Sequence, residues 1–181
     1  MAVALRSVET AAPNRERQRA AYLITFVCYG SGLHGRAGSV DLEHNAVGSP
    51  TLEESPRRLA WERSVMTQAP YVLDEPRRAA ALQGVKEACS RRGWMLLAAH
   101  VRASHVHAVV DADRTPEQVM SALKAYASKA LNESGLDQHD RRRWARHGST
   151  RYLWTKTEIT AAVHYVISKQ GEAMAMCSAS S

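Results

Sequence analysis

Long apolar runs and paired cysteines are both absent from this sequence. No stretch of about eighteen consecutive apolar residues occurs, so the sequence predicts no membrane-spanning helix. The opening residues MAVALRSVETAAPNRERQ lack the apolar segment of a secretory signal, and we expect the protein to stay in the cytoplasm. Its three cysteines, Cys28, Cys89 and Cys177, lie far apart and never form a CxxC pair. This spacing favours reduced thiols over a disulfide framework or a cysteine zinc site.

Acidic residues are fewer than basic ones. The 24 Lys and Arg residues exceed the 18 Asp and Glu residues, which gives a formal net charge of +6 and a pI of 9.5. The arginines gather in NRERQR, PRR, SRR and DRRRWARHG. Such an excess favours a polyanionic partner, because a protein that neutralises phosphates releases their condensed counterions. A basic, solvated surface without such a partner is the alternative reading of the charge.

The length and composition predict one domain with extensions. The chain has 181 residues, of which 45% are hydrophobic, enough for a single core. We expect a flexible arm over residues 1–18, a domain over 19–175 and a disordered tail over 176–181. Between residues 30 and 70 the sequence is dominated by Gly, Pro, Ser, Asn and charged residues, which predicts a long loop.

Hydrophobic periodicity and turn residues predict seven elements in the rest of the chain. Strands are expected at 21–29, 94–101, 105–112 and 151–155, and helices at 74–92, 115–131 and 158–170. The order is strand, helix, strand, strand, helix, strand, helix. It predicts an α+β fold of the ferredoxin-like or RRM-like kind. In this fold two helices cover one face of a four-stranded antiparallel sheet, and here an extra C-terminal helix is added.

The predicted helices carry start and stop signals. Asp74 can act as an N-cap, and Gly93 stands where a helix-ending glycine is expected. Thr115 and Gln118 have the spacing of a capping box, which opens the second helix. The last helix is expected to follow a cap at Thr157.

Two histidines, His105 and His107, flank a single valine in an otherwise apolar strand. Side chains two residues apart leave the same face of a strand about 7 Å apart, close enough to bind one metal ion. The other face, formed by Val106, Ala108 and Val110, is small and apolar, so we expect it to face the core and the histidines to lie on the open face. Two imidazoles there could hold an ion that acts as a Lewis acid on a phosphate. They could equally be exposed or hydrogen-bonded histidines without a metal.

Tyr165 lies on the last predicted helix, away from the stripe expected to be buried, which consists of Ile159, Val163, Val166 and Ile167. A large aromatic side chain off the core face could be a nucleophile that attacks a phosphodiester and stores the bond energy as phosphotyrosine. It could also simply cover the edge of the sheet.

Other aromatic and basic residues suit a single-stranded nucleic acid. Aromatic faces for base stacking are available from Tyr126, Trp144, Tyr152 and Trp154, although we expect Tyr126 and Trp154 to be partly core. The basic residues expected to contact DNA are Arg141, Arg142, Arg143, Arg146, Arg151, Lys124 and Lys169.

These features together resemble the single-tyrosine HUH transposases, which move simple insertion sequences as single-stranded DNA and include the REP-associated tyrosine transposases. The resemblance rests on the element order, on HVH at 105–107 and on the tyrosine in HYVISKQG. The segments YLITFVCYGSGLHGRAGSVDLEHN and GSTRYLW are also similar to segments of that family. The likeness covers about residues 20–175.

The resemblance implies a metal-dependent DNA endonuclease and transposase that cuts and rejoins single-stranded or hairpin DNA. In this class His105 and His107, with a third polar side chain from the tyrosine helix, would bind Mg²⁺ or Mn²⁺. Tyr165 would attack the scissile phosphate and give a 5′-phosphotyrosine and a free 3′-hydroxyl. The resemblance further implies a DNA partner bound through basic surfaces, a location with the nucleoid, no membrane association and a monomer or homodimer.

The chain departs from the family pattern in two places. Residues 102–104 read Arg-Ala-Ser where relatives commonly have Met-Pro-Asn. Many relatives also place a glutamine ligand four residues after the tyrosine, where this chain has Lys169 and puts Gln170 one position later. A residue five positions on points about 140° away on a regular helix. Gln170 is therefore the metal ligand only if the helix end is irregular near Gly171, and otherwise water or a residue such as Glu158 takes that place.

Two other functions stay open. A nucleic-acid-binding module could keep this fold and basic surface without cutting DNA. A metal-histidine hydrolase without a covalent intermediate would need a carboxylate-rich site, which the sequence does not show.

Overall fold

The computed structural model of this protein describes residues 21–31 and 55–179. The described elements are β1 (Ala21–Cys28), α1 (Pro56–Ser64), α2 (Glu75–Arg92), β2 (Met95–Val101), β3 (His105–Asp111), α3 (Pro116–Glu133), β4 (Trp144–Leu153), α4 (Lys156–Ser168) and β5 (Ala175–Ser178). The expected arm at 1–18 and most of the expected loop at 30–70 lie outside the described residues, and α1 occupies part of the remainder. Across the described ranges, no helix is both long and apolar enough to span a bilayer.

The five strands form one antiparallel sheet in the order β4-β1-β3-β2-β5. The first four strands have the predicted ferredoxin-like arrangement, so the fold class is confirmed. The fifth strand corrects the expected disordered tail, because residues 175–178 pair with the otherwise free edge of β2, with Cys177 opposite Ala99. Unpaired backbone groups at a sheet edge readily pair with another strand. The short segment AMCS has no sequence pattern that predicts such pairing.

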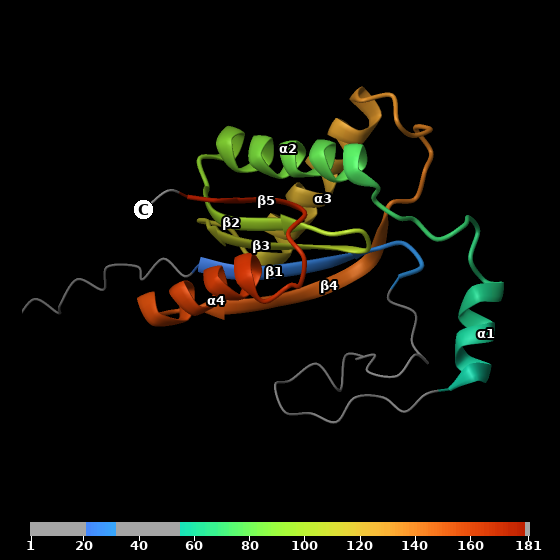
Figure 1. The fold of residues 1–181 in the computed structure, drawn as a ribbon, viewed down its shortest axis with the longest axis horizontal. Coiled ribbons are helices and arrows are strands. Elements are labelled where there is room, and N and C mark those ends of the chain that lie inside the picture. The colour runs from blue at the N-terminus through green and yellow to red at the C-terminus, as the bar shows by residue number, and fades with distance from the viewer. Residues whose placement is uncertain (1–20, 32–54, 180–181) are drawn as a thin grey trace, which may run out of the picture.

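Helices cover both faces of the sheet, with α2 and α3 on one face and α4 on the other (Figure 1). Val106, Ala108 and Val110 point into the larger core beneath α2 and α3, as their phase along β3 predicts. Val109, on the histidine face, packs in a second, smaller core with Ala162 of α4. The expectation that the histidine face is open is therefore wrong, since α4 covers part of it.

A close packing contact and the helix caps set the positions of the helices. A Cβ on Gly84 would come within 2.5 Å of the Tyr126 carbonyl oxygen, so α2 and α3 can cross this closely only because Gly84 has no side chain. Asp74 and Thr115 cap α2 and α3 as predicted. The cap of α4 is Thr155, which corrects the prediction of Thr157.

The fourth strand is much longer than predicted, and β4 begins at Trp144 rather than at residue 151. Its first half falls within the arginine-rich segment DRRRWARHG, which reads as a polar connection in the sequence. The segment is polar because β4 is an edge strand and most of its side chains are exposed. Apolar alternation, which is the usual sequence sign of a strand, is weak where so little is buried.

A buried ion-pair network ties α2, α3 and β4 together around Asp137. Its carboxylate accepts hydrogen bonds from Arg143 Nε at 2.8 Å, from Arg77 Nε at 2.9 Å and from the Tyr71 hydroxyl. Arg143 also donates to Asn132 Oδ1 at 2.7 Å. Burial by itself raises the pKa of Asp137, but the hydrogen bonds from Tyr71, Arg143 and Arg77 outweigh it and hold the pKa below its ordinary value.

We predict that Asp137→Ala lowers the free energy of unfolding by about 3–5 kcal/mol at neutral pH, because it leaves the buried Arg143 charge unpaired. The folded-state pKa of Asp137 is depressed, so its stabilisation is complete above the unfolded pKa of roughly 3.9 and is lost as the pH falls through the folded value. Urea denaturation across this pH range should show the difference between wild type and variant shrinking in acid. Asp140→Ala, at an exposed neighbouring position, is the control. A similar loss for both variants would contradict the role given to the network.

Candidate active site

The two histidines lie side by side at the start of β3, facing α4. Their ring centroids are 4.8 Å apart and the rings are roughly perpendicular. His107 is only 7% exposed, whereas His105 is half-buried. The site is therefore partly buried and does not lie on the open surface that strand phase alone predicts.

Hydroxyl groups hold one nitrogen of each imidazole. His107 Nδ1 lies 2.7 Å from Thr25 Oγ1, and His105 Nδ1 lies 3.0 Å from Ser104 Oγ. With each Nδ1–H donating to its hydroxyl, the Nε2 lone pairs are left for a ligand. Partners of this kind orient metal-binding histidines and determine which nitrogen carries the proton.

Burial also keeps both imidazoles neutral. It lowers the pKa of His107 to about 4, with a further contribution from neighbouring His105. The pKa of His105 is lowered too, first by burial and then by the positive charge of Arg102. A neutral imidazole has the lone pair that a metal ion requires, so both side chains have the right protonation state near neutral pH.

Tyr165 projects from α4 next to the histidines. Its ring centroid is 5.7 Å from that of His107, and 43% of the side chain is exposed. Within the described part of the chain no hydrogen bond holds its hydroxyl. Tyr165 is thus accessible from solvent beside the histidines.

The end of α4 is irregular, and this brings Gln170 to the histidines. The helix stops at Ser168, Lys169 leaves helical geometry with φ −112° and ψ 10°, and Gly171 has a φ of 77° that favours glycine. Gln170 lies within hydrogen-bonding reach of both imidazoles, a contact that raises their pKa against the effect of burial. Gln170 is therefore not turned about 140° away from Tyr165 as on a regular helix, because the chain has already left helical geometry at Lys169.

Glu158, the alternative third ligand, is already engaged elsewhere. Its carboxylate accepts hydrogen bonds from the backbone N–H groups of Trp154 and Thr155, both at 2.9 Å, and completes the cap of α4. These bonds also lower its pKa. No cluster of three His, Cys, Asp or Glu side chains that could hold a metal occurs in the described ranges. The donors gathered here are therefore two imidazoles and one amide.

This donor set could hold a divalent cation. The amide oxygen of Gln170 is a ligand of the kind that Mg²⁺ and Mn²⁺ take, whereas imidazole nitrogen also suits Zn²⁺ and other transition metals. All three groups are neutral, so the charge of a bound ion would be balanced by an anionic substrate rather than by the protein. The half-buried Arg102, whose Nη1 donates to the Glu172 carbonyl at 2.9 Å, adds a fixed positive charge beside His105.

A third buried histidine, His100, is part of the site and was missed by sequence reasoning. It stands directly opposite His107 on β2 and is fully buried. Its Nδ1 donates to the Val166 carbonyl at 3.0 Å, and its Nε2 accepts from the Met174 N–H at 3.2 Å. A carbonyl only accepts and an amide N–H only donates, so both bonds require the neutral Nδ1–H form. The one signal in the sequence is a polar residue within the apolar run LLAAHV.

The predicted DNA contacts separate into exposed and structural residues. Arg143 is buried in the Asp137 network, which corrects its assignment as a DNA contact because its guanidinium cannot reach a phosphate on the surface. Lys124 Nζ donates to the carbonyls of Ala145, Arg146 and His147. The guanidinium of Arg141 is bonded to Gln68, Ala69 and Pro70. The side chains that remain exposed for a phosphate are Arg142, Arg146, Arg151 and Lys169.

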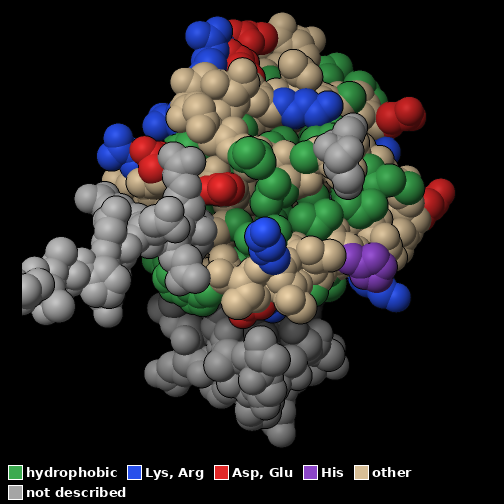
Figure 2. Space-filling view, turned by 90° about the vertical axis from the view of Figure 1, so that its left-hand side faces the viewer, with side chains coloured by type: hydrophobic (Ala, Val, Ile, Leu, Met, Phe, Trp, Pro, Cys, Tyr) green, Lys and Arg blue, Asp and Glu red, His purple; other side chains and the backbone are tan. Residues whose placement is uncertain are grey.

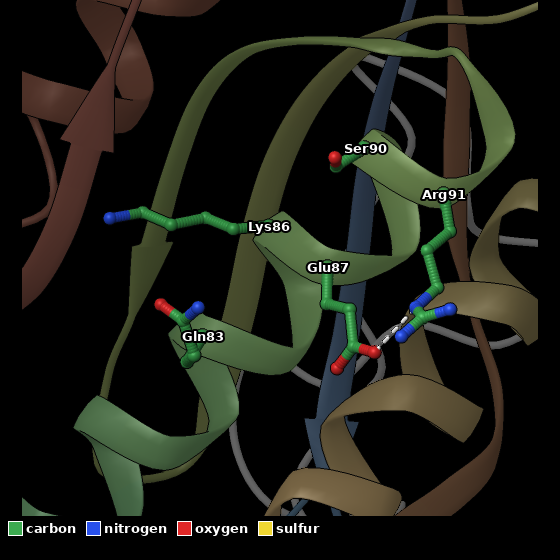
Figure 3. A pocket seen from close by; sticks show the side chains of 5 residues that line it. All are labelled: Gln83, Lys86, Glu87, Ser90 and Arg91. Carbon is green, nitrogen blue, oxygen red and sulfur yellow. Dashed lines mark hydrogen bonds and ion pairs between the residues drawn. The ribbon is translucent and has the colours of Figure 1, made fainter.

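A hollow on α2 is not related to this site. Gln83, Lys86, Glu87, Ser90 and Arg91 line it from one helix, and Glu87 is paired with Arg91 at 2.7 Å (Figure 3). Because α2 packs on the face of the sheet opposite to α4, the hollow and the histidines lie on different sides of the molecule.

Comparison with known proteins identifies a family for this chain. The family described as "Transposase IS200 like" matches residues 66–168, which is more than half of the chain and includes both histidines and Tyr165. A solved structure described as "Structure of the REP associates tyrosine transposase bound to a REP hairpin" is 9% identical with a TM-score of 0.44. That alignment covers 92% of this chain and 71% of the other. No curated protein matches the chain.

We predict that His100→Leu destabilises the protein, because it leaves the Val166 carbonyl and the Met174 N–H unpaired at a cost of ~1–3 kcal/mol each. Urea denaturation should show this loss, and hydrogen exchange at the Met174 amide should become faster. His164→Leu, at an exposed position on α4, is the control and should change little. Unchanged protection of the Met174 amide in His100→Leu would show that His100 does not hold this end of α4.

Proposed function

Because this chain belongs to the IS200-like transposase family, we propose that it is a metal-dependent endonuclease that cuts and rejoins single-stranded or hairpin DNA through Tyr165. The observation that supports this best is the placement of an exposed tyrosine 5.7 Å, between ring centroids, from a histidine pair that Gln170 also contacts. These residues come from β3, from α4 and from the turn after α4, so the fold brings them together.

In this proposal His105, His107 and Gln170 hold Mg²⁺ or Mn²⁺. The ion, when bound, supplies Lewis-acid chemistry that withdraws negative charge from a scissile phosphate. Thr25 and Ser104 keep the imidazoles oriented through their Nδ1 atoms.

Tyr165 acts as the nucleophile. Its phenol oxygen forms a bond to phosphorus while the bond from phosphorus to the DNA O3′ breaks. The phenolic proton leaves to solvent, which reaches this half-exposed side chain, and O3′ takes up a proton. The products are a 5′-phosphotyrosine and a free 3′-hydroxyl. Because the phosphotyrosine is itself a phosphodiester, a 3′-hydroxyl can reverse the step and rejoin the strand.

Phosphate contacts come from the side chains left exposed, Arg142, Arg146, Arg151 and Lys169, together with Arg102 beside the histidines. With a formal net charge of +6, binding should weaken steeply with salt. This charge supports a DNA partner. A DNA-binding protein that does not cut DNA would have the same basic surface, so the covalent step is the property to test.

We predict that the protein forms a covalent adduct with a labelled DNA hairpin that carries single-stranded flanks, in the presence of Mn²⁺. The adduct would appear as a shifted band on a denaturing gel, and Tyr165→Phe should abolish it while still binding the hairpin. Tyr126→Phe is the control, because Tyr126 lies on α3, on the opposite face of the sheet from the histidines. An adduct that survives Tyr165→Phe would refute this nucleophile. Binding by the wild type without any adduct across varied flanks would instead favour a binding module.

We predict that Gln170→Ala weakens Mn²⁺ binding whereas Lys169→Ala does not, because only Gln170 contacts the imidazoles. The loss should be at least as large as the roughly 10–100-fold effect of removing an outer-shell partner. Isothermal titration with Mn²⁺, or the electron paramagnetic resonance of free Mn²⁺, measures this without DNA cleavage. Equal affinities for the two variants would show that the third ligand is water or another residue.

A further inference from the structure

Two aromatic side chains stand stacked and exposed at the end of β4. The rings of Tyr152 and Trp154 are 5.2 Å apart between centroids and only 9° from parallel. Tyr152 is 44% exposed and Trp154 is 53% exposed, which corrects the expectation that Trp154 is partly core. Figure 2 looks onto this end of the sheet, where hydrophobic side chains make up much of the surface between scattered charged groups.

Both rings are held in place from behind. The buried Tyr22, directly opposite Tyr152 in the register, packs edge-on against it at 5.1 Å. The backbone N–H of Trp154 donates to the Glu158 carboxylate at 2.9 Å, so the α4 cap also fixes the position of the tryptophan. A platform that is ordered before its ligand arrives loses little entropy when the ligand binds.

The other two aromatic candidates do not provide such a surface. Trp144 packs edge-on against Phe26, and its Nε1 donates to Ser128 Oγ at 2.9 Å. Tyr126 is half-buried against the main core. Of the four aromatic residues singled out in the sequence, Tyr152 and Trp154 are therefore the pair that presents ring faces to solvent.

The charges around the pair favour nucleic acid. Arg151 is adjacent and Arg146 lies further along the same edge strand, and both are exposed. Two of the acidic residues nearby already have partners, since Glu158 caps α4 and Glu117 accepts a hydrogen bond from Thr150 at 3.5 Å. Cations beside parallel aromatic rings match a single strand, whose phosphates need positive charge and whose bases stack on ring faces.

The register places this pair on the other face of the sheet from the histidines, because Tyr152 is opposite Tyr22 of the main core whereas His107 is opposite Thr25. Thr25 of β1 is paired both with His107 and with Ser149 of β4, and Trp154 lies five residues beyond Ser149. At about 3.3 Å per residue along a strand and ~4.8 Å between strands, the pair is roughly 16 Å along and 10 Å across the sheet from His107. A flank of several nucleotides would connect the two by passing around β4, which is the edge strand of the sheet and carries the exposed Arg146 and Arg151.

We infer that Tyr152 and Trp154 form a stacking platform for an unpaired base in the single-stranded flank of the DNA substrate. The inference rests on the proposed function for its ligand, but it concerns a different surface from the histidines. The platform would determine which flank position is held, and it would accept any base because every base has a π-face.

The test measures binding of a hairpin with thymidine flanks, and of a matched series in which one flank nucleotide at a time is abasic. For the wild type, one abasic position should weaken binding on the order of tenfold, the typical effect of losing one base–aromatic stack. Trp154→Ala should weaken binding of the intact hairpin by a similar factor and should no longer respond to that abasic position. Trp154→Phe, which keeps a ring, should retain most of the affinity and the response.

Trp61→Ala is the matched control, because Trp61 is also exposed, at 64%, but lies on α1 away from the sheet. It should keep both wild-type affinity and the abasic response, and thermal unfolding should show that all variants fold. If the abasic site still weakened binding in Trp154→Ala as much as in the wild type, the platform would be overturned. The same would follow if Trp61→Ala behaved like Trp154→Ala.

The adduct assay separates this inference from the proposed function. An adduct without coupling between the abasic position and Trp154 overturns the platform and leaves the nuclease standing. Coupling without an adduct supports the platform on a protein that binds DNA but does not cut it. A wild type that does not bind the hairpin at all would overturn both.

Discussion

The packing of α4 against the second face of the sheet is the contact on which the rest of the candidate site depends. Ala162 and Val166 fill the small core with Ala98 and Val109, and His100 bonds the end of the helix to β2. Small residues on both surfaces let the helix approach closely. This one interface buries His107 and at the same time brings the tyrosine helix over the histidine pair.

Burial by α4 has a chemical consequence. Imidazoles on an open sheet would titrate near their ordinary pKa, whereas burial lowers the pKa of both His105 and His107 and favours their neutral forms. Hydroxyls occupy their Nδ1 atoms, so the same environment that removes water also directs the remaining lone pairs. Among the described residues the site gathers no carboxylate, and an anionic substrate would therefore contribute the negative charge.

Some of the site was predictable because strand phase and helix caps are local properties. The phase of Val106 against His105 and His107 follows from a two-residue period, and the Asp74 and Thr115 caps follow from short motifs. The cap of α4 was misplaced by two residues because Thr155 and Thr157 both resemble caps, and only the position of Glu158 against Thr155 decides between them. Arg143 was misassigned for a similar reason, since nothing in a run of three arginines shows which one meets a buried aspartate.

The sequence by itself determined the order of elements, the face of β3 that carries the histidines and the basic character of the chain, because these depend on residue type and spacing along a short stretch. Only the tertiary structure decided that α4 covers this face, that Gln170 reaches the histidines after the helix ends, and that Tyr152 and Trp154 stack at the sheet edge. Each of these is a contact between segments distant in the chain or at an irregular helix end. Such contacts depend on how surfaces fit together, which periodicity does not encode.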